Sequence, residues 1–433
     1  MEVVEMEVDA GRFHVQPSTH INTVTRPEKA EAENPVAREA QLRCELCYID
    51  DMNGLKAMSP AWDGLAKLCT GYSACVTYDY CEVAANRVFV EGGQLAVAKV
   101  YVDHDLVALW PVRICREGLL RIAKALTCGT DEEYGGPLIR DASNLSVLRA
   151  CLRAMLQLRA DVLEIPWVED GSSLQHAIEA TPQPDVLHLL PKKLITAPGY
   201  GGNPGYAIRL AGFDTWDNFI ASLPKSLRVN QRRTFKQLSQ TERTEFGWCK
   251  TIADADAVLE WLFENKRNWA KLRGKKTRYL MDDHLKIFFR GLARKTDLST
   301  IPLVAFVKVN DVPVAATVNL VGPRSFEYFI TTYDQAFSRY SVGALLLGYL
   351  VHWSYDHHLD FDMRYAYEGY KARWGNEVTY CRTHLIYLGP HTGRTLFSLL
   401  MLQIPRAKRA LRRLIDQREK SVALAGAAAK TFI

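Results

Sequence analysis

Two β-hairpin patterns that lie far apart in the sequence constrain the fold of this 433-residue chain more than any other feature. Residues 94–101 and 106–114 alternate apolar and polar side chains on either side of a short polar turn, which predicts an antiparallel hairpin with one buried face. Residues 304–309 and 312–320 repeat this pattern. Because single cores stop growing at about 250–300 residues, we expect two related lobes, each with one hairpin.

The segments around the first hairpin complete the expected first lobe. Ser59-Pro60 predicts a helix start, with the serine as N-cap and the proline at the first helical position. Apolar residues at helical spacing predict a helix at 145–158, and a buried strand is expected at 161–166. Residues 170–184 are polar and are predicted to form a loop.

The second lobe shows a similar series of patterns. We expect helices at 255–272, 282–295 and 343–357, and strands at 325–332 and 359–363. The Trp216-Asp217 dipeptide near the start of this lobe resembles Trp62-Asp63 in the first lobe, which is a weak sign of duplication.

The predicted fold class is therefore α/β (α+β), with two tandem lobes that each have a mostly antiparallel central sheet flanked by helices. The first 41 residues are rich in Glu, Pro, Thr and Asn and predict a flexible leader. Several Gly and Pro residues favour a linker between the lobes. The predicted boundaries are 1–41 for the leader, 42–191 for the first lobe, 192–206 for the linker, 207–390 for the second lobe and 391–433 for a basic helical tail.

The composition argues against several classes of protein. The net charge of +5 is too small to predict general nucleic-acid binding, and DNA is not expected as a partner. The acidic first residues lack a secretion signal, and the longest apolar stretches, of roughly 10 residues, reach about half of a membrane span. Ten scattered cysteines fit reduced thiols, so we expect a cytoplasmic protein.

Two groups of residues resemble metal ligands in spacing. Cys44 and Cys47 form a CxxC pair, but no second pair follows. His357 and His358 precede two aspartates, but the helix dipole favours histidines at a helix C-terminus, and strand alternation separates the carboxylates from them. We therefore predict no metal.

One segment of the second lobe predicts an anion site. A strand at 326–333, a loop at 334–342 and a helix that opens at Gly343-Ala344 direct free N–H groups and the positive end of the helix dipole at one spot. Arg339 and Arg324 are close enough in sequence to add positive charge. A pyrophosphate, such as that of coenzyme A, suits this geometry.

The same segment resembles a known family. The runs are Tyr333-Asp334-x4-Arg339-Tyr340-Ser341-x-Gly343-x2-Leu346 and Asp360-Phe361-Asp362-x4-Tyr367-Glu368-Gly369-Tyr370-Lys371-x2-Trp374. They resemble the CelD/BcsL-like acetyltransferases of the GNAT superfamily, which are named for cellulose biosynthesis and are related to the FemAB-type aminoacyl transferases. The likeness extends over roughly residues 42–388, through the Trp62 segment, Trp110-Pro111, Glu133-Tyr134-Gly135-Gly136-Pro137-Leu138 and the basic run Lys225-Ser226-Leu227-Arg228-x3-Arg232-Arg233.

The resemblance implies a GNAT-like fold for both lobes and acetyl-CoA or another acyl-CoA as donor. The implied donor-binding residues are Thr332, Tyr333, Arg339, Tyr340, Ser341, Val342, Gly343 and Ala344. One departure stands out, because Val342 occupies the position where the superfamily pattern Gln/Arg-x-x-Gly-x-Gly/Ala has its first glycine. A longer acyl-CoA or an aminoacyl-tRNA therefore stays open as the donor.

The resemblance also implies direct attack of an acceptor amine or hydroxyl on the thioester, which requires a base but no covalent residue. The candidate catalytic residues are Asp362, Glu368, Tyr370 and Lys371, and the sequence leaves the choice of base open. The expected activity is N- or O-acyl transfer to a sugar, a glycan precursor or a small biosynthetic metabolite. The alternatives are a FemAB-like transferase that uses aminoacyl-tRNA and a catalytically silent glycan-binding protein.

Basic segments predict contact with an anionic substrate or partner. The candidate substrate-binding residues are Arg228, Arg232, Trp269, Arg273 and Trp374. For the segments around Arg228 and Trp269, a solvated helix surface is the structural alternative. The basic helix at 406–420 is expected either to touch an anionic membrane surface or to pack on the second lobe.

Overall fold

A computed structural model describes part of the chain. The described residues are 42–69, 71–117, 120–130, 133–181, 186–189, 204–241, 243–274, 282–365 and 369–388. The predicted leader, most of the predicted linker and the predicted basic tail lie outside them, and the boundaries of the two lobes stay predictions. Within the described ranges, no helix combines the length and the apolar character that crossing a bilayer requires.

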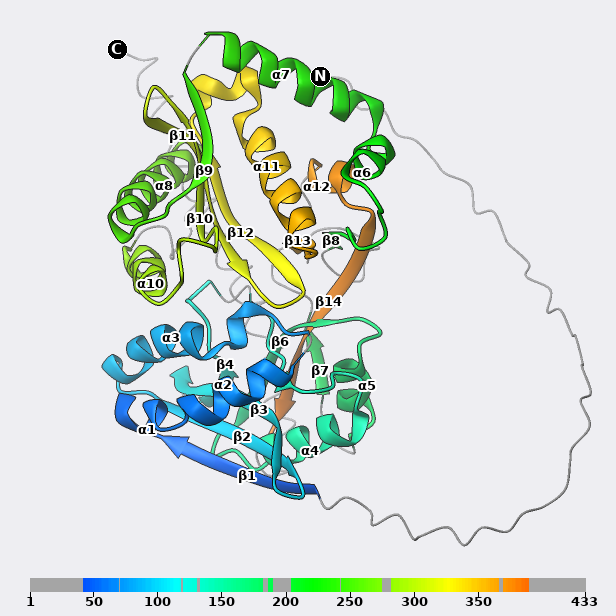
Figure 1. Ribbon diagram of the computed structural model, residues 1–433. Helices are drawn as coiled ribbons and strands as arrows, with labels where there is room; N and C mark the ends of the chain where they lie inside the picture. The colour runs from blue at the N-terminus through cyan, green and yellow to red at the C-terminus, as the bar shows by residue number, and fades with distance from the viewer. Residues whose placement is uncertain are drawn as a thin grey trace, which may run out of the picture. The chain divides into compact units, whose positions relative to one another are not determined.

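Residues 42–189 form what we call the first repeat unit (Figure 1). It begins with a strand and a group of helices, continues with a three-stranded meander, and ends with two further helices and three further strands. The elements are β1 (Leu42–Ile49), α1 (Met52–Lys56), α2 (Ser59–Leu68), η1 (Ala74–Val76), α3 (Tyr78–Val90), β2 (Gln94–Val102), β3 (Asp105–Glu117), β4 (Leu120–Ala125), β5 (Leu138–Ile139), α4 (Leu145–Met155), β6 (Val162–Glu169), α5 (Ser173–Glu179) and β7 (Val186–Leu189).

Residues 244–387 form the second repeat unit, which has the same order of elements. They are β9 (Thr244–Trp248), α8 (Ile252–Leu272), α10 (His284–Ala293), β10 (Val304–Val309), β11 (Val312–Val321), β12 (Ser325–Tyr333), η2 (Gln335–Tyr340), α11 (Val342–Asp356), β13 (Asp360–Tyr365), α12 (Lys371–Trp374) and β14 (Glu377–Tyr387). A connecting segment between the units holds β8 (Pro204–Ile208), α6 (Trp216–Ser222) and α7 (Lys225–Thr241).

Strand pairing confirms that the two units are related. In each unit three antiparallel pairs are followed by one parallel pair, β4 with β6 in the first and β12 with β13 in the second. The strand after the crossover helix bulges in both, at Trp167 (φ 55°) and at Arg364 (φ 60°). The Trp-Asp dipeptides, however, are not equivalent, because Trp62 lies in α2 after the first strand of its unit, whereas Trp216 opens α6 before β9.

The two units share one sheet through an exchange of strands. The long strand β14 pairs with β8 through residues 377–380 and with β6 through residues 381–387, and β8 in turn pairs with β13. The parallel pair of the first unit is therefore extended by β14, the last strand of the second unit, and the parallel pair of the second unit is extended by β8, which follows the first unit. Figure 1 shows β14 running from the second unit into the first.

Alternation along the strands of the second unit places its helices on opposite faces of the sheet. Val304 and Phe306 belong to the core under α8, while Ala305 and Val307 belong to the core under α11. The core under α8 continues into the first unit, where the Tyr80 ring meets Phe288 of α10 at a centroid distance of 5.0 Å.

Within the described residues, the predicted helices and strands are confirmed with shifts of a few residues, with two exceptions, while the predicted helix at 406–420 lies outside them. Residues 170–184 were expected to be a loop, but they contain α5, which the Ser172 hydroxyl caps by accepting from the Gln175 N–H at 3.2 Å. Ala177 and Ile178 are buried, and this short apolar face is enough to hold the helix. Ser59 is not the N-cap of α2 but its first residue, and Met58 precedes it without a side-chain cap.

Candidate functional site

The start of α11 is an open helix N-terminus. Ser341, between η2 and α11, has left-handed backbone angles (φ 52°, ψ 39°), and its side chain makes no capping hydrogen bond. Its carbonyl accepts from the N–H groups of Ala344 at 2.8 Å and Leu345 at 3.0 Å. A non-glycine residue with positive φ is uncommon and is often found where a backbone conformation serves a function. The first turn of α11 therefore directs its N–H groups and dipole toward an anion.

The side chains before the first turn of α11 differ in whether they face this turn. Tyr333 is exposed, and a Cβ atom placed on Gly343 would lie 3.4 Å from its ring, so the tyrosine stands beside the first turn. The Arg339 guanidinium lies over the Tyr340 ring and donates to its hydroxyl at 2.7 Å. Thr332 is buried and donates to Asn265 of α8 at 3.2 Å, so its hydroxyl is directed away from the turn.

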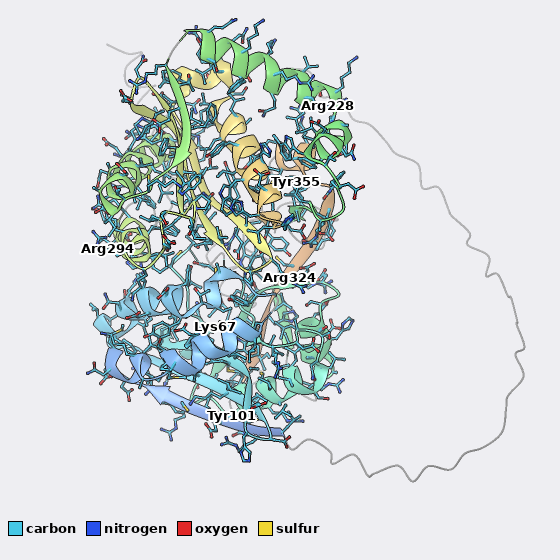
Figure 2. The ribbon with its side chains drawn as sticks, in the orientation of Figure 1. Lys67, Tyr101, Arg228, Arg294, Arg324 and Tyr355 are labelled. Atoms are coloured by element: carbon cyan, nitrogen blue, oxygen red, sulfur yellow. The ribbon has the colours of Figure 1, made fainter. Side chains whose placement is uncertain are left out.

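Two sequence expectations change at this turn. Val342, which stands where the superfamily pattern has its first glycine, is fully buried in the core under α11. Arg324 does not add charge to the anion site. It precedes β12 and lies against Gly71 of the first unit (Figure 2), whereas Arg339 follows β12, a nine-residue strand of about 30 Å.

Asp362 and Lys371 meet at the bulge of β13. One Asp362 carboxylate oxygen accepts from the Arg364 backbone N–H at 2.6 Å, and the Lys371 ammonium donates to the Arg364 carbonyl at 3.4 Å. The two side chains therefore hold the positive-φ residue Arg364 through its backbone N–H and its carbonyl. Tyr370 packs on the core under α11, and Glu368 lies outside the described residues.

Side chains of the first unit complete this region. The Tyr134 hydroxyl donates to the second Asp362 oxygen at 2.5 Å. Glu327 of β12 is 1% exposed and pairs with the Arg364 guanidinium at 2.9 Å, while it accepts from the Ser73 hydroxyl at 2.7 Å. Asp362 thus lies in a polar network that both units build.

Burial governs the protonation of this network. Burial raises the pKa of the Glu327 carboxyl against the opposing charge of Arg364. Burial and the neighbouring Asp362 carboxylate hold the pKa of Tyr134 well above its usual range, so its hydroxyl stays a hydrogen-bond donor.

Sequence reasoning missed most of these groups. Glu327, Arg364 and Ser73 were not predicted, and Tyr134 entered only as part of the resemblance. The signal for Glu327 was a charged residue inside the otherwise uncharged strand SFEYFITTY, because buried carboxylates require a partner.

The five predicted substrate-binding residues fall into two places. Arg228, Arg232 and Trp374 line a pocket of about 650 Å³ between α6, α7, α11 and α12, and Figure 2 shows Arg228 at the start of α7. Trp269 lines a pocket of about 280 Å³ on α8, with Arg273 over its ring. Because α8 and α11 cover opposite faces of the sheet, the two groups do not form one site.

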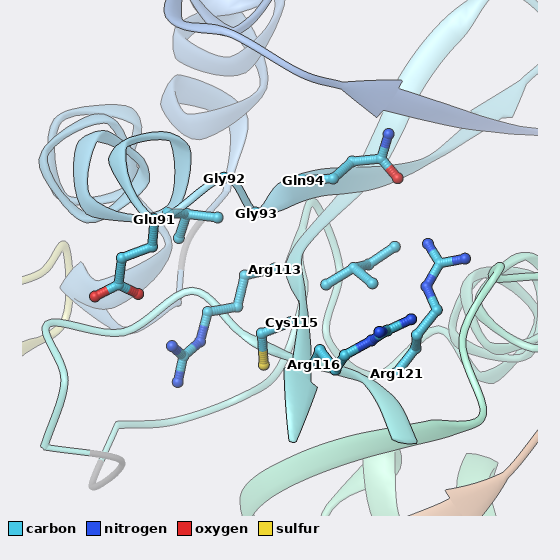
Figure 3. Close-up of a pocket in the computed structure, with 10 residues that line it drawn as sticks. Glu91, Gly92, Gly93, Gln94, Arg113, Cys115, Arg116 and Arg121 are labelled. Atoms are coloured by element: carbon cyan, nitrogen blue, oxygen red, sulfur yellow. The ribbon is translucent and has the colours of Figure 1, made fainter. Parts of the chain in front are cut away.

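A third pocket, of about 370 Å³, lies at the β3–β4 hairpin of the first unit (Figure 3). Arg113, Arg116 and Arg121 line it, and the last two are directly opposite each other on the paired strands. None of the predicted site residues lies there.

The predicted absence of a metal concerned two groups. Cys44 and Cys47 are both free thiols on β1. His357 stacks on Trp353 at a centroid distance of 3.8 Å, and its Nδ1 is 2.7 Å from the Trp353 carbonyl oxygen. In the part of the chain that the structure describes, no three His, Cys, Asp or Glu side chains are grouped as metal ligands.

Comparisons with known proteins give one family match. Residues 225–372 match the model of a family described as "Acetyltransferase (GNAT) domain", which covers the stretch from α7 to the beginning of α12. No curated protein matches the chain.

Three solved structures are similar to the chain. FemX is 10% identical, with a TM-score of 0.55 over 75% of this chain and 95% of FemX. A conserved protein of unknown function from Bacteroides thetaiotaomicron is 12% identical over 80% of this chain and all of its own, with a TM-score of 0.49. A tandem GNAT protein from the clavulanic acid biosynthesis pathway is 10% identical over 80% of this chain and 99% of its own, with a TM-score of 0.39.

The likeness to FemX concerns the fold alone, and the family match covers about a third of the chain. Neither finding singles out the CelD/BcsL-like family. Residues 225–372 are therefore similar to a GNAT acetyltransferase domain, and the fold of the chain is similar to that of FemX.

Proposed function

We propose that this protein is an acyltransferase that takes an acyl group from acyl-CoA at the start of α11 and transfers it to an amine or hydroxyl of a sugar, a glycan precursor or a small metabolite. The observation that carries the proposal is the uncapped first turn of α11, which follows the left-handed Ser341 inside the stretch that matches the GNAT domain. A diphosphate fits this turn because the turn offers N–H groups and a positive dipole end.

The proposed reaction is a single displacement. The acceptor nitrogen or oxygen bonds to the thioester carbon, the carbon–sulfur bond breaks, and a base takes the acceptor proton. CoA departs as a thiolate, which then receives this proton from the base. Asp362 is our candidate for this base among the described residues, since Tyr134 and the Arg364 N–H hold its carboxylate in one orientation. Lys371 acts as a positioning residue through the bulge at Arg364.

Isothermal titration with CoA tests the donor site. The variant Gly343→Asp with Arg339→Glu introduces a carboxylate at the second position of α11 and reverses the neighbouring charge. We expect at least a tenfold loss of affinity.

The first repeat unit provides a matched control. Ser146 is exposed and occupies the second position of α4, the helix equivalent to α11. Ser146→Asp places the same carboxylate as Gly343→Asp at the second position of the equivalent helix, and CoA affinity should not change. Absence of CoA binding by the unaltered protein, or equal affinity in all three proteins, contradicts the proposal.

A second function is favoured by the charge of α7. This 17-residue helix carries Lys225, Arg228, Arg232, Arg233 and Lys236 and contains no acidic residue. Such a surface suits the phosphates of an aminoacyl-tRNA donor. If tRNA is the donor, filter binding should show retention that falls steeply with salt, and Arg233→Glu with Lys236→Glu should weaken it. No retention at low ionic strength excludes this candidate.

A further inference from the structure

The pocket of about 650 Å³ beside α11 lies between two helix faces. Arg228, Arg232 and Phe235 of α7 line it, and so do Leu345 and Tyr349 of α11. Within each set the residues are three or four positions apart, so they lie on one side of their helix. The size of the pocket is within the range of about 300–1,000 Å³ that is usual for small-molecule sites.

Aromatic side chains form much of the wall. They are Trp216, Phe235, Phe246, Tyr349 and Trp374. Between ring centroids, Phe246 lies 5.9 Å from Phe235 and 6.0 Å from Tyr349, so these three rings form a continuous cluster. Aromatic side chains are the groups on which nucleic-acid bases stack. The wall therefore suits a flat heteroaromatic ring.

Two arginines give the same wall groups that bind phosphate. Arg232 is exposed, while the Arg228 Nε is buried and has no hydrogen-bond partner among the described residues. Buried donors are nearly always satisfied, so this Nε indicates a missing acceptor. Guanidinium groups match phosphate oxygens in geometry and charge. Asp217 also lines the pocket, and its carboxylate can accept from the amino group of a base. A ligand that satisfies all these groups combines a base with a phosphate.

The pocket begins at the proposed diphosphate site. Leu345, which lines it, belongs to the first turn of α11. Gln231 also lines it and donates to the Ala344 carbonyl of that turn at 3.0 Å. In CoA the adenosine 3′-phosphate is joined directly to the diphosphate, whereas the thioester lies at the far end of the pantetheine arm. The nucleotide is therefore the part of CoA that a pocket within one helical turn of the diphosphate can hold.

The position of Asp362 leaves the pocket free of the reactive end of the donor. Asp362 is in register with Glu327, the third residue of β12, whereas the first turn of α11 follows the last residue of this strand, Tyr333. The diphosphate and the proposed base therefore lie toward opposite ends of β12. Because Phe361 belongs to the core under α11, the Asp362 side chain also lies on the other face of the sheet.

We propose that this pocket holds the nucleotide half of the donor, with the adenine ring among the aromatic side chains and the 3′-phosphate on the guanidinium groups of Arg228 and Arg232. This inference rests on the proposed function and deepens it, because it specifies which part of CoA the chain recognises beyond the diphosphate. The helices α6 and α7, which precede the second repeat unit, supply much of this recognition.

Isothermal titration with CoA and dephospho-CoA tests the two proposals separately, because dephospho-CoA lacks only the 3′-phosphate. We expect CoA to bind at least about tenfold more tightly, since hydrogen bonds to a charged group are lost with this phosphate. If neither compound binds, the proposed function fails. If both bind with equal affinity, the proposed function stands and the nucleotide inference is wrong.

Two arginines form a matched pair for this measurement. Arg232 lines the pocket, whereas Arg243, two residues after the end of α7, has a side chain that is 78% exposed and does not line it. Arg232→Gln should reduce the preference for CoA over dephospho-CoA at least about threefold, and Arg243→Gln should leave it unchanged. Thermal unfolding of both variants shows whether the fold is intact. An equal change of preference in both variants, or no change in either, overturns the inference.

Adenosine 3′,5′-bisphosphate tests the aromatic wall, because it is the nucleotide half of CoA alone. Phe235 is 50% exposed and lines the pocket, whereas Val229 on the same helix is 55% exposed and does not. Phe235→Ser should weaken binding of the bisphosphate at least about fivefold, and Val229→Ser should not. The bisphosphate should also compete with CoA. An affinity for CoA that is unchanged when the bisphosphate is bound would identify a nucleotide site unconnected with the donor and would contradict the inference.

Discussion

The two repeat units have the same order of elements but differ at the start of the equivalent helices α4 and α11. Asn144 caps α4 by accepting from the Val147 N–H at 3.1 Å, and Asp141 stands three residues earlier. Ser341 leaves α11 without a side-chain cap and follows two residues after Arg339. One turn is thus satisfied by its own chain and has an acid nearby, while the other is open and has a base nearby. The candidate site therefore depends on whether the first turn of the helix is capped by its own chain, and not on the fold, which both units share.

The bulged strands differ in the same sense. Two residues before the bulge, the first unit has Ile165, which is 1% exposed, and the second has Asp362. The first unit contributes to the polar network from other positions, through Tyr134, Ser73 and the Ala74 backbone N–H. Groups of the first unit therefore hold the side chains of the polar network in the second unit.

The largest expected effect tests whether the polar network of the second unit is required for stability. Glu327→Ala leaves the buried Arg364 guanidinium without its carboxylate, and we expect the free energy of unfolding in urea to fall by about 3–5 kcal/mol. Replacement of both partners, as Glu327→Leu with Arg364→Met, should be much milder. A single variant as stable as the double one would show that the pair is not needed.

The next effect tests whether Tyr134 of the first unit positions the Asp362 carboxylate of the second. Tyr134→Phe removes the hydrogen bond to Asp362, and we expect kcat to fall about tenfold with the KM for donor unchanged, as measured by release of the CoA thiol. Tyr101→Phe is the control, because Tyr101 also donates to a carboxylate, Glu45 at 3.3 Å, but on the outer strands of the first unit. Equal rates in the two variants would argue against a positioning role for Tyr134.

A smaller effect tests the difference between the helix starts directly. Asn144→Ala removes a cap and should lower the free energy of unfolding by about 1 kcal/mol. Ser341→Ala removes no capping bond and should change it by less than about 0.5 kcal/mol. Equal losses in thermal or urea unfolding would mean that the two turns do not differ as described.

The smallest effect tests the contact between the units. Burial, with the charge of Arg87, lowers the pKa of His284, whose ring lies against Gly129 of the first unit. The folded state therefore binds this proton less readily than the unfolded state. The contribution to stability is complete above the ordinary histidine pKa of about 6.5 and is lost as the pH falls through the lowered folded-state value. The pH dependence of unfolding should be shallower in His284→Gln below pH 6.5, and an unchanged slope would contradict this assignment.

Local patterns predicted most of the helices and strands, since alternation and helical spacing are written within each segment. The hairpins at β2–β3 and β10–β11 and the helix α11 are examples. Helix α5 was missed because it is only seven residues long and its apolar face is limited to Leu174, Ala177 and Ile178, although Ser172 offered a cap signal. The open turn at Ser341 was predicted in position, but the direction of the Thr332 hydroxyl was not, because it depends on packing against Asn265 of α8.

Sequence patterns did not predict the contacts between segments that lie far apart in the chain. No local pattern shows that β14 joins β6, that α10 of the second unit packs on α3 of the first, or that Tyr134 reaches Asp362. Such contacts are set by register and by complementary surfaces that meet only after both units fold.

The exchange of β14 has a consequence for synthesis of the chain. Strand β6 is complete early, but the strand that covers its open edge is made about ten to forty seconds later at elongation rates of about 5–20 residues per second. During that interval the newborn first unit exposes unpaired backbone groups that can join another chain. Expression of the first unit alone should therefore give an aggregation-prone product, and co-production of a β14 peptide should rescue it.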